Sequence, residues 1–236
     1  MAESFEYRDL SGAEFWGVGL RGATFRDVDL TNAEFTRVFL VNVDIDALVD
    51  RVVINGVDIT DYVNERDPWY PLRSLIRSPE PEGMRTALTA LQDAWAATIA
   101  LAGELPEAKL HQSVNGEWSF IETLRHLVFA IDKWFTVPLV GGSFHSMGLP
   151  NRGSADFPWP GLNRSASPTF AEAVVARAER LTRLRSYLET LAPADLTNSV
   201  EILENGPNPV QECLFTVFDE EFAHNRYASR DLALLQ

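Results

Sequence analysis

Polar side chains that can bind a metal ion gather on one face of the last predicted helix, over about residues 209–235. Glu220 and His224 are four positions apart, so they lie one turn apart on that face. A carboxylate and an imidazole at this spacing can bind one metal ion. An ordinary solvated helix face is the alternative interpretation of such a pair. The other residues of this face follow at steps of three and four: Cys213, Val217, Tyr227, Asp231 and Leu235.

A third ligand is available on a second predicted helix, over about residues 119–136. His126 lies away from the main apolar stripe of that helix. Glu122 lies there too, but we expect it to form a capping box with Ser119 at the helix start. A lone helical histidine is usually structural, so His126 is a candidate only together with Glu220 and His224.

The neighbours of these candidates receive simpler interpretations. Asp231 lies two turns from His224, about 10 Å along the axis, so we expect it to pair with Arg230 or Arg226. Cys213 is expected to be a small buried core residue. His145, in the long segment 138–166, is a candidate fourth ligand or substrate contact, and a plain surface histidine is an equal alternative.

Periodic apolar residues predict a bundle of four helices, over about 83–103, 119–136, 167–191 and 209–235. Ser167 and Pro168 predict the start of the third helix. A segment of about 30 residues precedes it, and such a crossover allows consecutive helices to run in an unusual order. The third helix also carries a basic face, which we expect to be solvated: Arg177, Arg180, Arg183 and Arg185.

A five-residue pattern runs through the first sixty residues, and neither a helix nor a strand has that period. It requires a chain that turns a corner every five residues and points the same positions inward. From Phe15 onward, a small or β-branched residue stands two positions before each large one: Ala13, Val18, Ala23, Val28, Ala33, Val38 and Val43. The large apolar positions are Leu10, Phe15, Leu20, Phe25, Leu30, Phe35, Leu40 and Ile45.

The repeat sequences SGAEF, RGATF, TNAEF and VNVDI resemble the pentapeptide-repeat family. This resemblance implies a right-handed quadrilateral β-solenoid with four repeats per coil. We therefore expect an α+β multidomain protein, with a solenoid over 1–62, a proline-rich docking linker over 63–82 and a four-helix bundle over 83–236. Some pentapeptide-repeat proteins imitate DNA, but the short solenoid disfavours that role here.

The bulk composition restricts the classes of function. The chain has 236 residues, one cysteine and a net charge of −14, and this acidity disfavours direct nucleic-acid binding. No window approaches the roughly 20 apolar residues of a membrane span. The lone cysteine excludes an internal disulfide, and the N-terminus lacks the pattern of a signal peptide. We therefore expect a cytoplasmic protein.

Three segments of the bundle, WSFIETLRHLVFAIDKW, FHSMGLP and EEFAHNRYASRDLALL, together resemble the DinB superfamily, in particular its actinobacterial-looking members. The resemblance covers most of residues 68–236. It implies a divalent metal bound by one histidine of the second helix and an HxxxH pair of the fourth. By position these ligands are His126, Glu220 in place of the first histidine of the pair, and His224. Two histidines and a carboxylate remain a competent site for zinc, nickel, iron or manganese.

Two functions follow as hypotheses, and the sequence leaves open whether the protein is an enzyme. Some DinB members are S-transferases or isomerases that use mycothiol or bacillithiol. The first hypothesis is therefore a metal-dependent transferase that presents such a low-molecular-weight thiol to a small-molecule substrate under the loop 138–166. The alternative is a noncatalytic scaffold whose acidic solenoid face binds a protein partner or a second copy of the chain.

Overall fold

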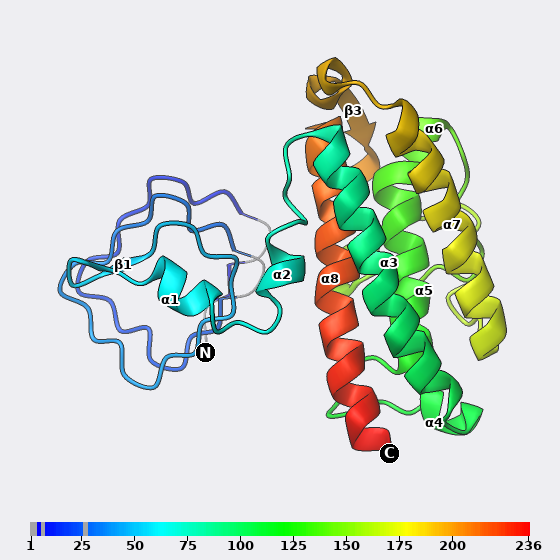
Figure 1. The fold of residues 1–236 in the computed structure, drawn as a ribbon, viewed down its shortest axis with the longest axis horizontal. Helices are drawn as coiled ribbons and strands as arrows, with labels where there is room; N and C mark the ends of the chain where they lie inside the picture. The colour runs from blue at the N-terminus through cyan, green and yellow to red at the C-terminus, as the bar shows by residue number, and fades with distance from the viewer. Residues whose placement is uncertain (1–3, 6–7, 26–27) are drawn as a thin grey trace. The chain divides into compact units, whose positions relative to one another are not determined.

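The computed structural model describes residues 4–5, 8–25 and 28–236 (Figure 1). Contacts between residues divide the chain into two compact units, Met1–Asp46 and Ala47–Gln236. This division lies closer to the N-terminus than the expected boundary at residue 62.

The backbone of the first unit turns at intervals of five residues, as the sequence pattern predicts. The turns alternate between two kinds. Those that follow Leu10, Leu20 and Leu30 are closed by a hydrogen bond from the N–H of the alanine three positions later, at 2.9, 3.1 and 3.0 Å. The underlying period is therefore ten residues, which matches the alternation of leucine and phenylalanine. Positive φ angles mark the described corners: Gly12 (75°), Gly17 (64°), Gly22 (71°), Asn32 (62°), Arg37 (56°) and Asn42 (54°).

The large apolar side chains of the repeat differ from the expectation, because they are not buried. Their exposed fractions run from 43% at Leu10 to 69% at Ile45. Within the described part of this unit there is no β-strand, and the main-chain hydrogen bonds given above lie within single turns. The large side chains of the described repeats therefore remain accessible to water.

The second unit begins with short elements that lead to the bundle. These are β1 (Val53–Ile54) and β2 (Val57–Asp58), which pair in antiparallel fashion, and α1 (Thr60–Asn64) and α2 (Tyr70–Arg73). Trp69 packs edge-on against Phe222, with ring centroids 6.3 Å apart, and Ile76 is 3% exposed in the core. These contacts with the bundle involve two residues of the segment 63–82, for which the sequence predicted a docking linker.

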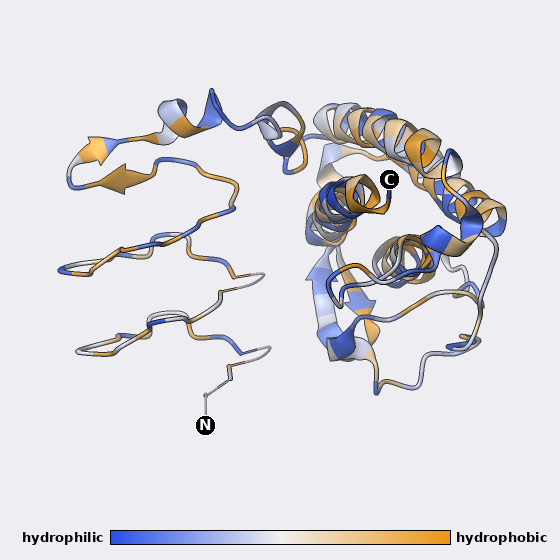
Figure 2. Cartoon of the chain, turned by 90° about the horizontal axis from the view of Figure 1, so that it is seen from below, coloured by the Kyte–Doolittle hydropathy of each residue, from blue (hydrophilic) through white to orange (hydrophobic). Residues whose placement is uncertain are grey.

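Four long helices form the bundle, and each contacts two of the others. They are α3 (Pro81–Gly103), α5 (Phe120–Ile131), α7 (Phe170–Thr190) and α8 (Val210–Leu235). α3 and α5 each contact both α7 and α8, so α5 lies between α7 and α8. Every residue of α5 except Glu122 is buried. Figure 2 views the helices nearly end-on.

The helices do not alternate in direction. In Figure 1, α3 and α8 run downward while α5 and α7 both run upward, so α5 and α7 are parallel. The long segment between them makes this order feasible, because it returns the chain to the end at which α5 began. It contains α6 (Val137–Val140) and a 3₁₀ turn at Arg152–Ser154. A short helix, α4 (Glu107–Leu110), connects α3 and α5.

Capping residues explain where two of the helices begin. Ser119 and Glu122 form the expected capping box at the start of α5. The expected start at Ser167 and Pro168 is wrong, because α7 begins after Thr169. The side chain of Thr169 accepts from the N–H of Glu172 and completes a second capping box.

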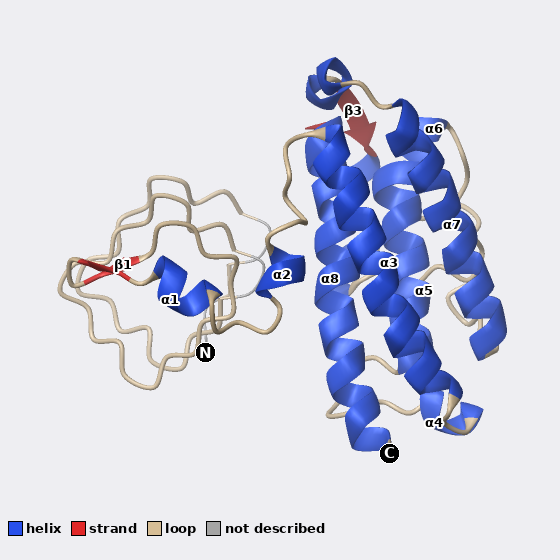
Figure 3. Cartoon of the chain, in the orientation of Figure 1, coloured by secondary structure: helices blue, strands red, loops and turns tan. Residues whose placement is uncertain are grey.

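A π-helical turn, Asp132–Thr136, extends α5 and buries both Asp132 and Lys133. The hairpin of β3 (Ser199–Ile202) and β4 (Gly206–Pro209) precedes α8 and was not expected from the sequence (Figure 3). Its 3₁₀ turn carries Glu204, whose carboxylate accepts a 2.7 Å hydrogen bond from Lys133. This contact links the β3–β4 hairpin to the π-helical turn at the end of α5.

Candidate metal centre

Two adjacent helices bring the three predicted ligands together. α8 presents Glu220 and His224 one turn apart, and α5 presents His126 toward them from the neighbouring position in the bundle. One ligand atom from each of the three lies within 4.8 Å of the others, and this is the only such group of three or more among the described residues.

Both imidazoles of the cluster meet the same carboxylate oxygen. Oε2 of Glu220 lies 3.2 Å from Nε2 of His126 and 3.1 Å from Nε2 of His224. The side chains become more exposed in the order His126 (3%), His224 (15%) and Glu220 (26%). The cluster is therefore enclosed on the α5 side and reaches solvent through α8.

The environment of Glu220 favours its ionised form. Burial alone would raise the pKa of this carboxyl group. When both imidazoles are protonated, hydrogen bonds from His126 and His224 and the charges of the two rings outweigh burial and hold the pKa of Glu220 well below its usual range. Glu220 is thus a carboxylate at neutral pH, as a metal ligand must be.

The second nitrogen of His126 is also engaged. Its Nδ1 lies 2.9 Å from the main-chain oxygen of Leu149, in the loop between α6 and α7. A carbonyl oxygen only accepts hydrogen bonds, so Nδ1 must carry the proton in this contact. A partner of this kind fixes the tautomer of a histidine and leaves Nε2 to face the cluster.

Aromatic rings border the two histidines. The ring centroid of Trp118 lies 4.5 Å from that of His126 and 5.8 Å from that of His224, and it stacks on the second at 26°. Tyr227 meets His224 edge-on at 5.8 Å and is 41% exposed. One side of the cluster is thus covered by indole, and Tyr227 stands where the cluster reaches solvent.

His145 lies apart from the cluster. Its main-chain N–H donates to the carboxylate of Asp132 at 2.7 Å, and its ring Nδ1 accepts from the main-chain N–H of Met147 at 3.3 Å. Burial lowers the pKa of His145, and the charge of Arg180 lowers it further. The side chain borders a groove between the loop and α7, together with residues that include Glu172 and Glu179.

The interpretations of Asp231 and Cys213 are confirmed. Asp231 pairs with Arg230, with 2.7 Å between oxygen and Nε. Cys213 is 0% exposed, and burial raises the pKa of its thiol to about 11. Neither side chain belongs to the cluster.

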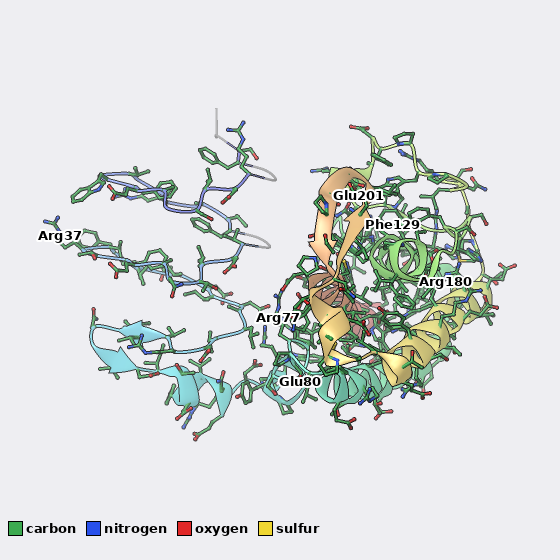
Figure 4. The ribbon with its side chains drawn as sticks, turned by 90° about the horizontal axis from the view of Figure 1, so that it is seen from above. Arg37, Arg77, Glu80, Phe129, Arg180 and Glu201 are labelled. Carbon is green, nitrogen blue, oxygen red and sulfur yellow. The ribbon has the colours of Figure 1, made fainter. Side chains whose placement is uncertain are left out.

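The expectation of a solvated arginine face on α7 is wrong for two of its four residues. Arg177 forms a buried ion pair with Glu221, and Arg180 forms another with Asp132, 3.1 Å from Nε to Oδ1. Figure 4 labels Arg180 on α7 and Phe129 on α5. Because α7 packs against α5 and α3, side chains on this face meet the carboxylates of other helices inside the bundle.

Two groups that contact the cluster were not predicted from the sequence, Trp118 and the carbonyl of Leu149. Trp118 directly precedes the capping box of α5, and this position was a usable signal that its ring stays near the helix start. The carbonyl of Leu149 had no such signal, because its contact depends on how the long loop returns to α5.

The fold and the site define a multidomain protein in which a four-helix bundle with a His-Glu-His cluster follows a unit of five-residue repeats. The family model of the DinB superfamily matches residues 90–228, and the model of pentapeptide repeats matches residues 9–45 with eight copies. The chain belongs to the DinB superfamily and carries pentapeptide repeats before the DinB domain. No curated protein and no solved structure matches it.

None of the helices in the described parts of the chain combines the length and the apolar character needed to span a membrane.

Proposed function

We propose that His126, Glu220 and His224 bind a divalent metal ion. We further propose that the protein is a thiol-dependent S-transferase that requires this ion. The observation that carries the proposal is the convergence of two imidazole Nε2 atoms on one carboxylate oxygen, at 3.2 and 3.1 Å. Membership of a superfamily whose members are often metal-binding supports it.

The spacing of the donor atoms fits a metal ion. Ligand atoms about 2.1 Å from a tetrahedral ion lie roughly 3.4 Å from one another. The two nitrogen–oxygen distances, 3.1 and 3.2 Å, are close to this separation, so small side-chain movements suffice to admit an ion. Zinc, nickel, iron and manganese all accept two imidazoles and a carboxylate.

Proton balance at His126 supports the same conclusion. Leu149 oxygen and the Glu220 carboxylate both only accept hydrogen bonds, and they face the two nitrogens of one imidazole. A neutral imidazole carries one proton and can satisfy only one of them. If the proton is on Nδ1, a metal cation between Nε2 and the Glu220 carboxylate satisfies both groups. His126 then does not need to be an imidazolium.

Three protein ligands leave at least one coordination position for a small molecule. A bound divalent ion supplies the positive charge that lowers the pKa of a thiol and favours the thiolate. The thiol is a small cofactor such as mycothiol or bacillithiol, because Cys213 is buried and far from reactive. In the transfer, its sulfur forms a bond to an electrophilic carbon as the leaving group departs, and the thiol proton passes to water. A cytoplasmic setting, where such thiols stay reduced, is part of this proposal.

Elemental analysis of the untagged protein tests the metal site. We expect one equivalent of a divalent metal per chain, and its loss in His126→Ala. His111→Ala is the matched control, because His111 is an exposed histidine at the end of α4. His145→Ala tests the fourth-ligand hypothesis, and we expect it to retain the metal. Metal-free wild-type protein, or metal retained in His126→Ala, would contradict the proposal.

The transferase step has its own test. Isothermal titration of the metal-loaded protein with mycothiol or bacillithiol should show binding that His126→Ala abolishes and His111→Ala preserves. If the protein binds the metal but neither thiol, the proposed metal site stands and the proposed transferase activity is refuted.

A second candidate function concerns the repeats. We propose that they form a quadrilateral β-solenoid that contacts a second copy of the chain, and one observation favours such a contact. Phe39 and Trp16 are 93% and 75% exposed in a unit that also carries many carboxylates. Sedimentation velocity should then show a concentration-dependent dimer that Phe39→Ser weakens. A monomer throughout the concentration range would exclude this interface.

A further inference from the structure

A buried arginine stands next to His126 on α5 and has an unusual set of partners. Arg125 is 6% exposed, and within the described residues it forms no ion pair with a carboxylate. Glu122 acts on it only through its charge, and burial lowers the pKa of the guanidinium. Arginine nevertheless stays protonated in proteins, so a cation is buried here without a paired anion. Such burial is costly unless hydrogen bonds compensate it.

Main-chain carbonyls of the long loop supply those hydrogen bonds. Nε of Arg125 donates to the oxygen of Met147 at 2.8 Å, and Nη2 donates to the oxygens of Arg164 at 3.2 Å and Asn163 at 3.4 Å. The guanidinium therefore ties both the beginning and the end of the loop to one point on α5.

The same stretch of loop contacts the two neighbouring residues of α5 in register. The N–H of Leu149 donates to the main-chain oxygen of Arg125 at 3.2 Å. The oxygen of Leu149 accepts from Nδ1 of His126 at 2.9 Å. Residues 147–149 thus lie along the helix, held on one side by Arg125 and in contact with His126 on the other.

We propose that Arg125 is a positioning residue for the metal centre, acting through the loop. It holds residues 147–149 so that the carbonyl of Leu149 fixes the Nδ1 proton and the ring plane of His126, which leaves Nε2 directed at Glu220. This inference rests on the proposed metal-binding role of the cluster. Residues 147–149 have no regular secondary structure of their own, so the direction of the Leu149 carbonyl depends on its anchors.

A second buried side chain, Lys133, anchors a different part of the loop and provides a control. Lys133 is also buried on this helix, 7% exposed, and its Nζ donates to Oγ of Ser154 at 3.2 Å and to Glu204 at 2.7 Å. It therefore ties down the middle of the loop, and within the described part of the chain it forms no hydrogen bond or ion pair with residues 147–149. Removing it loosens the loop without touching the segment that meets His126.

The test compares Arg125→Met with Lys133→Met in the full chain. Long-range ¹H–¹⁵N NMR on metal-free protein reports which nitrogen of His126 carries the proton, and calorimetric titration with Zn²⁺ reports affinity. We expect Arg125→Met to lose the Nδ1–H signature of His126 while His224 is unchanged, and to weaken Zn²⁺ binding by about 10–100-fold, the usual effect of an outer-sphere partner. Lys133→Met should retain both the signature and the affinity.

Arg125→Lys provides the conservative variant. It keeps the charge and one carbonyl contact, so we expect recovery of part of the affinity, and it remains informative if Arg125→Met fails to fold. An unchanged His126 signature in the Arg125 variants, or an equal loss of affinity in Lys133→Met, would overturn the inference. A wild-type protein that binds no Zn²⁺ would instead refute the proposed function, and the NMR signature would still test the link from Arg125 to His126.

Discussion

His126 and Glu220 are 94 positions apart in the chain, and Nε2 of the first lies 3.2 Å from Oε2 of the second. The contact joins α5 to α8. This contact joins the Glu220 and His224 pair of one helix to His126, and the three side chains form a cluster that can hold a metal ion.

Exchanging Glu220 tests whether a carboxylate is required at this position or only a ligand. Glu220→Gln removes the negative charge and should lower Zn²⁺ affinity by at least about 100-fold, since even outer-sphere partners contribute about 10–100-fold. Glu220→His restores a ligand and should bind within about tenfold of the wild type. Competition with a chromogenic chelator measures both. Equal affinities in Glu220→Gln and the wild type would remove Glu220 from the ligand set.

Trp118 should report metal binding through its fluorescence, because its ring lies 4.5 and 5.8 Å from the two imidazoles. A paramagnetic ion such as Co²⁺ at the cluster should quench this indole more than the other five tryptophans of the chain. Trp118→Phe should therefore lose most of the quenching while the metal stoichiometry stays the same. Undiminished quenching in this variant would place the ion elsewhere.

Cys213 should be unreactive in the folded protein. Burial raises the pKa of its thiol from 9.0 to about 11, so at pH 8 about 0.1% is thiolate, roughly a hundredfold less than in an ordinary thiol. Titration with a disulfide reagent should show a slow reaction that becomes fast on unfolding. Rapid modification of native protein at pH 8 would contradict the burial of this side chain.

The raised pKa of the Cys213 thiol also predicts that the folded state loses stability as the pH rises above 9. Between pH 9 and about 11 the unfolded thiol releases a proton that the folded one keeps, so the unfolded state binds fewer protons and is favoured as the pH rises. The stability that the protonated Cys213 thiol contributes to the folded state is therefore fully present below pH 9. Cys213→Ala should flatten this part of the dependence of unfolding free energy on pH, measured by urea denaturation.

The buried ion pair of Arg177 and Glu221 should be sensitive to removal of one partner. Both side chains are nearly inaccessible, at 5% and 1%, so Arg177→Met leaves a buried carboxylate without its cation. We expect a loss of about 3–5 kcal/mol in unfolding free energy. Arg183→Met is the matched control on the same helix, and its exposed side chain should change stability by less than about 0.5 kcal/mol. Similar losses in both variants would show that the pair has no special role.

Local patterns in the sequence were sufficient to predict the four long helices, the turns at intervals of five residues and the three residues of the cluster. The apolar periodicity predicted all four long helices, and Ser119 with Glu122 predicted the start of α5. The five-residue pattern predicted a corner every five residues, and the structure has corners at Gly12, Gly17 and later positions at this spacing. These features depend on interactions between residues that are close in sequence, so they can be predicted from the sequence alone. His126, Glu220 and His224 were candidates because residue type and helical spacing are also local properties.

Only the tertiary structure decided how these parts meet. It placed Arg177 and Arg180 inside the bundle, because a helix face is solvated or buried according to which helices pack against it. It left the large apolar positions of the repeats exposed, because burial of a side chain depends on what packs against it and not on the repeat pattern alone. It separated His145 from the cluster and brought Leu149 to His126 instead, because the path of a long crossover is set by contacts such as those of Arg125, far from the loop in sequence.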